Sequence, residues 1–322
     1  MPRQTTTDAA ALGLFALLCL MWGSGWLALK IGVTALPPLL FASSRFLGAS
    51  AALLAMLLML GRLRGLLALP WRAALPGALL MFAANYGLMA WGVTRAASGL
   101  SAVVNLATVP LAMAVFGRIY GVARLTGRTL AGLALGSVGL ALLLLPPVFA
   151  KPGVGDLGPA TALGLLAIAG GASCYAWGSV LTRRHVNLGH VPALELSTYQ
   201  ALVGGAVLLA ASALAEPWAD LGAALEPTRL GGWGFLVTVT VVSSPVYLAL
   251  LARWAPSRVA AYAYVCPVIA VAEGVLLGGE VLTLAQAAAA LVLGLSAWLV
   301  LGTAPDAAPR VEPAAPSAQP LS

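Results

Sequence analysis

Uncharged apolar stretches follow one another along almost the whole chain, and they constrain its fold more than any other feature. A helix crosses the hydrocarbon core of a bilayer with about 20 apolar residues. With 61% hydrophobic and only 8% charged residues, against about 25% charged residues in a typical soluble domain, the chain cannot cover a water-facing surface. The sequence therefore predicts an all-α membrane protein with ten transmembrane helices. The predicted spans are 9–29, 38–60, 73–93, 99–117, 129–147, 161–182, 193–214, 231–251, 259–279 and 282–302.

The formal net charge of +7 does not point to nucleic acid, because the basic residues lie singly or in small groups between apolar runs. This distribution is typical of topology signals, since Lys and Arg concentrate in cytoplasmic loops. With a cytoplasmic N-terminus, twelve of the 17 basic residues fall in cytoplasmic segments and four in outside loops, while Arg45 lies within a span. The bias predicts a multi-pass protein of the inner (cytoplasmic) membrane with both termini cytoplasmic, which requires an even number of spans.

Short motifs recur at a nearly constant distance along the chain. Trp22-Gly23-Ser24 returns 155 positions later as Trp177-Gly178-Ser179, and Pro110 returns 157 positions later as Pro267. Because five spans is an odd number, the second copy would enter the membrane inverted, as in many secondary transporters. The expected organisation is a cytoplasmic N-terminus (1–8), a first five-helix repeat (9–147), a periplasmic linker (148–160), a second inverted repeat (161–302) and a disordered cytoplasmic tail (303–322).

These motifs resemble the EamA repeat of the drug/metabolite transporter superfamily. The first half resembles its opening through Trp22-Gly23-Ser24, Lys30-Ile31-Gly32, Pro37-Pro38 and Arg45-Phe46. The second half is similar to its closing motif through Tyr264, Pro267, Gly279-Glu280 and Leu282-Thr283. The resemblance implies a central cavity and the export or exchange of a small metabolite by alternating access, without ATP hydrolysis. Two departures are Ala123-Arg124 before Leu125-Thr126 and an acidic Glu273 in the ninth span.

Two charged residues lie inside predicted spans. Glu273 shares a helical face with Tyr262 and Cys266, and an ionisable group at that depth is costly unless it is paired, hydrated or protonated. The hypothesis is that Glu273 carries a proton or binds a cationic group of the substrate; the alternative is a bond between helices that only fixes packing. Arg45 is interpreted as a structural charge that snorkels or bonds backbone carbonyls, and an ion pair with Glu273 is a further expectation.

Other polar and aromatic residues within the spans are candidates for the substrate path, because such side chains face the protein interior. They are Trp22, Ser24, Asn85, Tyr86, Asn105, Trp177, Ser179, Tyr247 and Tyr262. Pro110, Pro245 and Pro267 are predicted helix breaks, since proline removes a backbone donor.

An intramembrane enzyme and a receptor or structural protein are the alternative functional classes. An intramembrane enzyme would need a nucleophile with a base within reach, yet neither histidine falls in a span. A receptor or structural protein would favour long loops or a soluble domain, which the sequence lacks. The expected partners are a small-molecule substrate, the lipid bilayer and protons, with no cofactor, no metal and no nucleic acid; a homodimer is compatible with the chain.

Overall fold

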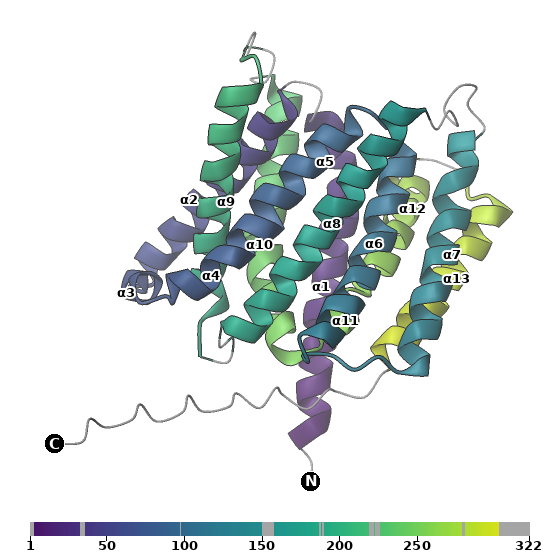
Figure 1. Cartoon of the computed structure of the whole chain (residues 1–322), viewed down its shortest axis with the longest axis horizontal. Helices are drawn as coiled ribbons and strands as arrows, with labels where there is room; N and C mark the ends of the chain where they lie inside the picture. Colours follow the sequence, from purple (N-terminus) through teal and green to yellow (C-terminus); the bar gives the residue numbers. More distant parts are fainter. Residues whose placement is uncertain are drawn as a thin grey trace.

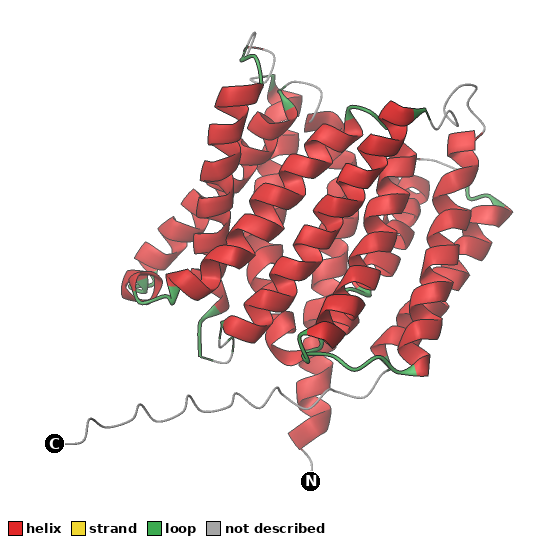
Figure 2. Cartoon of the chain, viewed as in Figure 1, coloured by secondary structure: helices red, strands yellow, loops and turns green. Residues whose placement is uncertain are grey.

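The computed structural model is an all-helical bundle over the residues that it describes (Figures 1 and 2). These residues are 3–32, 36–96, 98–149, 158–186, 188, 190–218, 222, 226–278 and 281–302. The predicted tail 303–322, most of the linker 148–160 and the Gly279-Glu280 motif lie outside them.

The helices follow the predicted spans closely. Their bounds are α1 Arg3–Gly32, α2 Pro38–Met59, α3 Leu63–Leu67, α4 Trp71–Ala78, the π-helix η1 Leu79–Ala84, α5 Asn85–Val93, α6 Ser98–Ile119, α7 Gly127–Phe149, α8 Pro159–His185, α9 Ala193–Ala215, α10 Pro227–Arg253, α11 Pro256–Val259, α12 Tyr262–Gly278 and α13 Leu284–Leu301. Within the described ranges, nine helical segments are long and apolar enough to cross a membrane, and the apolar part of α1, Ala9–Gly25, is shorter.

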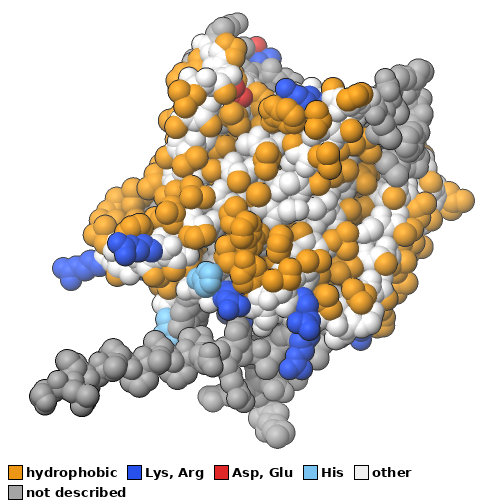
Figure 3. All heavy atoms as spheres, viewed as in Figure 1, with side chains coloured by type: hydrophobic (Ala, Val, Ile, Leu, Met, Phe, Trp, Pro, Cys, Tyr) orange, Lys and Arg blue, Asp and Glu red, His pale blue; other side chains and the backbone are white. Residues whose placement is uncertain are grey.

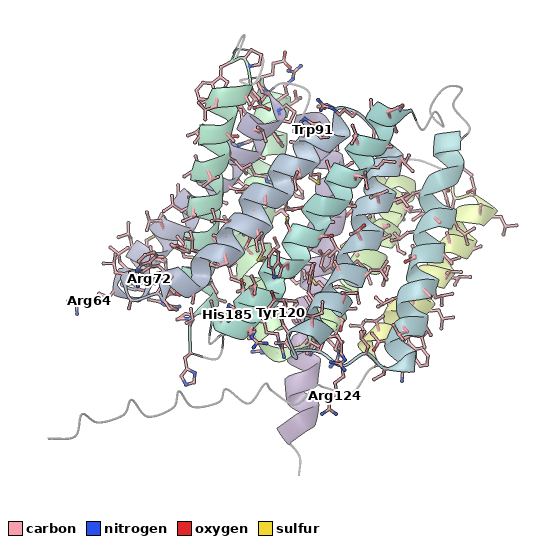
Figure 4. The ribbon with its side chains drawn as sticks, viewed as in Figure 1. Arg64, Arg72, Trp91, Tyr120, Arg124 and His185 are labelled. Atoms are coloured by element: carbon pink, nitrogen blue, oxygen red, sulfur yellow. The ribbon has the colours of Figure 1, made fainter. Side chains whose placement is uncertain are left out.

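The surface of the bundle agrees with a lipid environment. Hydrophobic side chains cover the flank seen in Figure 3, while Lys and Arg side chains lie near its two ends. Arg64, Arg72 and Arg124 project at the end of the bundle where α1 begins (Figure 4). The last turn of α13 lies at this same end (Figure 1).

The three prolines predicted as helix breaks lie inside continuous helices. The helices continue through Pro110 in α6, Pro245 in α10 and Pro267 in α12, so none of these prolines interrupts its helix. Neighbouring helices and side chains can accommodate the missing backbone donor. The irregular backbone lies elsewhere, at the short turn between α11 and α12 and at η1, which divides the predicted span 73–93.

Glycines of two neighbouring helices leave room for η1. A Cβ added at Gly178 of α8 would lie 2.7 Å from the Met81 side chain, and one at Gly204 of α9 would lie 2.2 Å from Cβ of Phe82. Close backbone approach at glycine is the usual way in which membrane helices pack tightly. The wider π turn is therefore held between α8 and α9, whose glycines leave room for its side chains.

Helix pairs from different halves of the sequence make the most extensive contacts. α2 packs on α9, α7 on α13 and α1 on α10, while α8 packs on α5 and α6. Acidic side chains join α2 to α9 at both ends. Glu216 accepts hydrogen bonds from the backbone N–H groups of Leu39 (2.8 Å) and Leu40 (3.0 Å), which caps the positive N-terminal end of α2.

At the opposite end of this pair, Arg62 holds Glu195 through two parallel hydrogen bonds. Its Nε donates to Oε1 at 3.0 Å and its Nη2 donates to Oε2 at 2.9 Å. The Glu195 side chain is only 2% exposed, so this carboxylate depends on the guanidinium for its charge balance.

The transmembrane helices α1 and α12 approach each other closely at Gly23. A Cβ added there would lie 2.8 Å from Cβ of Ile269, whereas one at Gly25 would meet only the Leu236 Cδ2 atom at 3.8 Å. The contact at Gly23 sets the separation of the two helices, because neither backbone nor a branched Cβ can move aside easily.

We expect Gly23→Ala to destabilise the protein by about 1–3 kcal/mol through overpacking, with Gly25→Ala as the matched control that leaves stability nearly unchanged. Thermal unfolding of both variants in the same detergent measures the difference. Equal melting temperatures for the two variants would show that α1 and α12 do not depend on this contact.

Loss of the arginine that pairs with a buried carboxylate is expected to lower stability more than loss of the arginine that pairs with an exposed carboxylate. Arg62→Met should destabilise the protein by about 3 kcal/mol, because Glu195 is left buried and unpaired. Arg229→Met is the control, since its partner Glu226 is 56% exposed and such surface pairs contribute about 0–1 kcal/mol. Size-exclusion chromatography after heating measures how much of each variant stays folded. A similar loss of stability in both variants would contradict the role of Arg62 as the partner of a buried carboxylate.

Candidate functional site

Aromatic side chains from three transmembrane helices meet inside the bundle. The ring of Trp22 (α1) lies 4.4 Å from that of Tyr262 (α12) in an edge-to-face contact and 5.6 Å from that of Tyr247 (α10), between centroids. Tyr247 and Tyr262 are almost fully buried. All three residues are candidates from the sequence, and the structure brings them together.

Two further tyrosines extend this group. Tyr175 of α8 lies 5.8 Å from Tyr247 between ring centroids, and Tyr86 and Tyr262 are further neighbours of its phenol. We call Tyr86, Tyr175, Tyr247 and Tyr262 the phenol cluster. Tyr175 was missed by the sequence analysis; its place two residues before the repeated Trp177-Gly178-Ser179 motif is the signal that could have identified it.

Hydrogen bonds fix the rings of the site. Trp22 Nε1 donates to Ser243 Oγ at 2.8 Å, and Tyr247 Oη donates to Ser179 Oγ at 2.7 Å. Ser179, which is fully buried, donates in turn to the backbone carbonyl of Tyr175 at 2.8 Å. Polar groups at membrane depth are thus satisfied by one another, and they orient the aromatic faces.

Ser24 connects α1 to the carboxyl group of Glu273 on α12. Its Oγ lies 2.5 Å from Glu273 Oε1 and 2.8 Å from the backbone carbonyl of Leu20. A hydroxyl carries a single proton, so it cannot donate fully to both acceptors. The short contact ties α1 to α12 and places the Glu273 carboxyl group beside the Trp22-Gly23-Ser24 motif.

The expected ion pair between Arg45 and Glu273 is wrong. Neither of the two ion pairs among the described residues includes Arg45 or Glu273. Arg45 instead places its guanidinium carbon 4.5 Å from the ring centroid of Phe46 and 5.1 Å from that of Tyr86. The prediction used depth along each helix alone, whereas the two side chains face different neighbours.

The remaining candidates lie apart from the cluster. Trp177, which is 38% exposed, donates to Tyr120 Oη at 2.9 Å and stacks on Phe116; Tyr120 lies at the end of the bundle where α1 begins (Figure 4). Asn85 is buried beside Gly171 of α8. Asn105 makes only a weak contact from its Nδ2 to Met89 Sδ at 3.8 Å.

A groove of about 490 Å³ lies on another part of the molecule, between the first turn of α2, η1 with α5, and the end of α9. Its lining is almost wholly apolar, with Trp91, Thr94 and Glu216 among it. Glu216 is already occupied by the capping of α2. Because the groove offers few free polar groups, the phenol cluster is the stronger candidate for recognition of a solute.

Comparisons with known proteins agree with the bundle and its motifs. The chain is 33% identical over 295 residues to the uncharacterised inner membrane transporter YedA of Escherichia coli K12, covering 90% of this chain and 86% of YedA. It is 29% identical over 292 residues to the uncharacterised transporter YvbV of Bacillus subtilis, covering 89% and 90% of the two chains.

A solved structure titled only as a crystal structure of a protein shares the fold, with a TM-score of 0.75 at 20% identity over 91% of this chain and 97% of that one. The model of the EamA-like transporter family matches twice, at residues 9–145 and 162–302. This confirms the resemblance seen in the motifs: the chain is a multi-pass membrane protein that belongs to the EamA-like transporter family.

Proposed function

We propose that the chain is a secondary transporter that exports or exchanges a small organic solute across the inner membrane by alternating access, with Glu273 as a proton carrier. The observation that carries the proposal is the contact between Ser24 and Glu273 beside an aromatic and phenolic interior. The family and its relatives support transport across the inner membrane.

The helix contacts support two inverted repeats. If each helix of the first half is exchanged with its counterpart in the second half, α1 becomes α8, α5 becomes α10 and α6 becomes α12. The contact of α1 with α10 then becomes that of α8 with α5, and the contact of α1 with α12 becomes that of α8 with α6. The pairs α2 with α9 and α7 with α13 map onto themselves. Such a frame allows two conformations in which the halves exchange roles.

The chemistry of the two halves differs within this shared frame. The position that corresponds to Glu273, 157 residues earlier, is Phe116. Phe116 stacks on Trp177 at 6.0 Å between ring centroids, whereas Glu273 contacts Ser24. A proton would therefore be held by one half only.

Glu273→Gln is expected to uncouple protons from the solute, because glutamine resembles the neutral carboxyl group but cannot release a proton. Metabolite comparison of media from deletion and overexpression strains first identifies the solute. In proteoliposomes that contain a pH dye, the variant should retain solute counterflow and lose solute-driven proton movement. Glu226→Gln, at an exposed acid, is the control that should retain both; normal proton movement in Glu273→Gln would refute the carrier role.

The proposed topology places both chain ends in the cytoplasm and the segment near Lys151 outside. Green fluorescent protein fused to either terminus should fluoresce, and alkaline phosphatase fused at Lys151 should be active. If only one of the two terminal fusions fluoresces, the termini lie on different sides of the membrane, which would exclude a pair of inverted five-helix repeats.

A further inference from the structure

Arg45 is a charged side chain whose partner is missing from the described parts of the chain. Its Nε atom is buried and has no hydrogen-bond partner. The guanidinium lies over Phe46 and Tyr86, and contacts of this kind contribute attraction from the ring faces. Ring faces do not satisfy the directed N–H donors of a guanidinium, which has five of them and no acceptor.

No carboxylate of the described side chains balances Arg45. The four glutamates whose side chains are described all have other partners: Glu195 binds Arg62, Glu216 caps α2, Glu226 binds Arg229 and Glu273 contacts Ser24. Ionisable residues inside membrane spans mark substrate or ion pathways in many membrane proteins. The interpretation of Arg45 as a purely structural charge therefore leaves its donors unexplained.

The position of the second half that corresponds to Arg45 carries no charge. The position 155 residues after Arg45 is Gln200 in α9. Gln200 is buried, and its neutral amide lies 3.4 Å from Thr182 Oγ1. A neutral residue with an internal partner thus suffices for packing in the second half, whereas the first half carries a positive charge at the corresponding position.

Arg45 also borders the phenol cluster. Its guanidinium carbon is 5.1 Å from the ring centroid of Tyr86, which is a neighbour of Tyr175 and Tyr262. A guanidinium matches a carboxylate through two parallel hydrogen bonds. Beside it, aromatic faces from four helices offer an apolar surface with hydroxyl groups.

We propose that Arg45 binds the carboxylate of the transported solute, and that the apolar or aromatic body of this solute packs against the phenol cluster. The inference rests on the proposed transport function and narrows its substrate class to small organic acids. An amine or a neutral amide of the same shape would leave the donors of Arg45 unsatisfied, and the site should reject it.

Three probes with the same phenylpropyl skeleton test this selectivity: hydrocinnamate, its amide hydrocinnamamide and the amine phenylpropylamine. Binding to the purified chain in detergent is measured by isothermal titration calorimetry. We expect hydrocinnamate to bind about tenfold or more tightly than the other two, as befits a hydrogen bond to a charged group. Absence of hydrocinnamate binding, or equal binding of the amide or the amine, would overturn the proposal.

Variants of Arg45 test whether this residue binds the carboxylate of hydrocinnamate. Arg45→Gln should weaken hydrocinnamate binding about tenfold or more and remove the preference for it over the amide, while Arg45→Lys should retain part of the preference, because it keeps the charge without the planar fork. Arg95→Gln is the matched control: Arg95 lies 3.7 Å from the ring centroid of Trp91 but is exposed, and its removal should leave all three affinities unchanged.

Each outcome bears on one proposal. Unchanged hydrocinnamate affinity in Arg45→Gln would refute the role of Arg45, and if that variant does not fold, an undiminished preference in Arg45→Lys would do so. Proton coupling in proteoliposomes is a separate readout. Selective binding by Arg45 together with normal proton movement in Glu273→Gln would reject the proton carrier and leave the carboxylate site in place.

Discussion

The hydrocarbon core of a bilayer supplies no hydrogen bonds, and the whole structure depends on that constraint. The backbone meets it with helices throughout the described spans. Polar side chains meet it by bonding one another, as in the series from Tyr247 through Ser179 to the carbonyl of Tyr175. Where a helix begins, the same requirement draws in a carboxylate from another helix, as Glu216 does at α2. These internal hydrogen bonds all follow from this one requirement.

Against this background, the groups that remain without a complete set of partners become informative. Ser24 faces two acceptors with one proton, and Arg45 has a buried donor with no acceptor. We propose a proton carrier at the first place and an anionic ligand at the second. Both residues lie beside the aromatic interior rather than at the flank of the bundle, where the large groove offers mainly apolar contacts.

The sequence predicted the spans well because length and apolar composition alone determine what a bilayer accepts. It also identified Trp22, Tyr247 and Tyr262, since aromatic and polar residues at membrane depth face inward. It could not place η1, whose wide turn depends on glycines 178 and 204 from distant segments. The erroneous pairing of Arg45 with Glu273 has a similar origin: depth follows from counting residues, but the direction of a side chain around its helix depends on tertiary packing.

Phe116 in the first half corresponds to Glu273 in the second half, and this difference has a thermodynamic consequence. If both Phe116 and Glu273 were carboxylic acids, interchange of the two halves would interchange two equal proton sites, and the inward-facing and outward-facing forms would have the same overall proton affinity. A ligand with equal affinity for two states cannot shift their populations. A duplicated frame with an acid in only one copy escapes this cancellation, so that, with Glu273 as the proposed proton carrier, pH itself can shift the balance between the two forms.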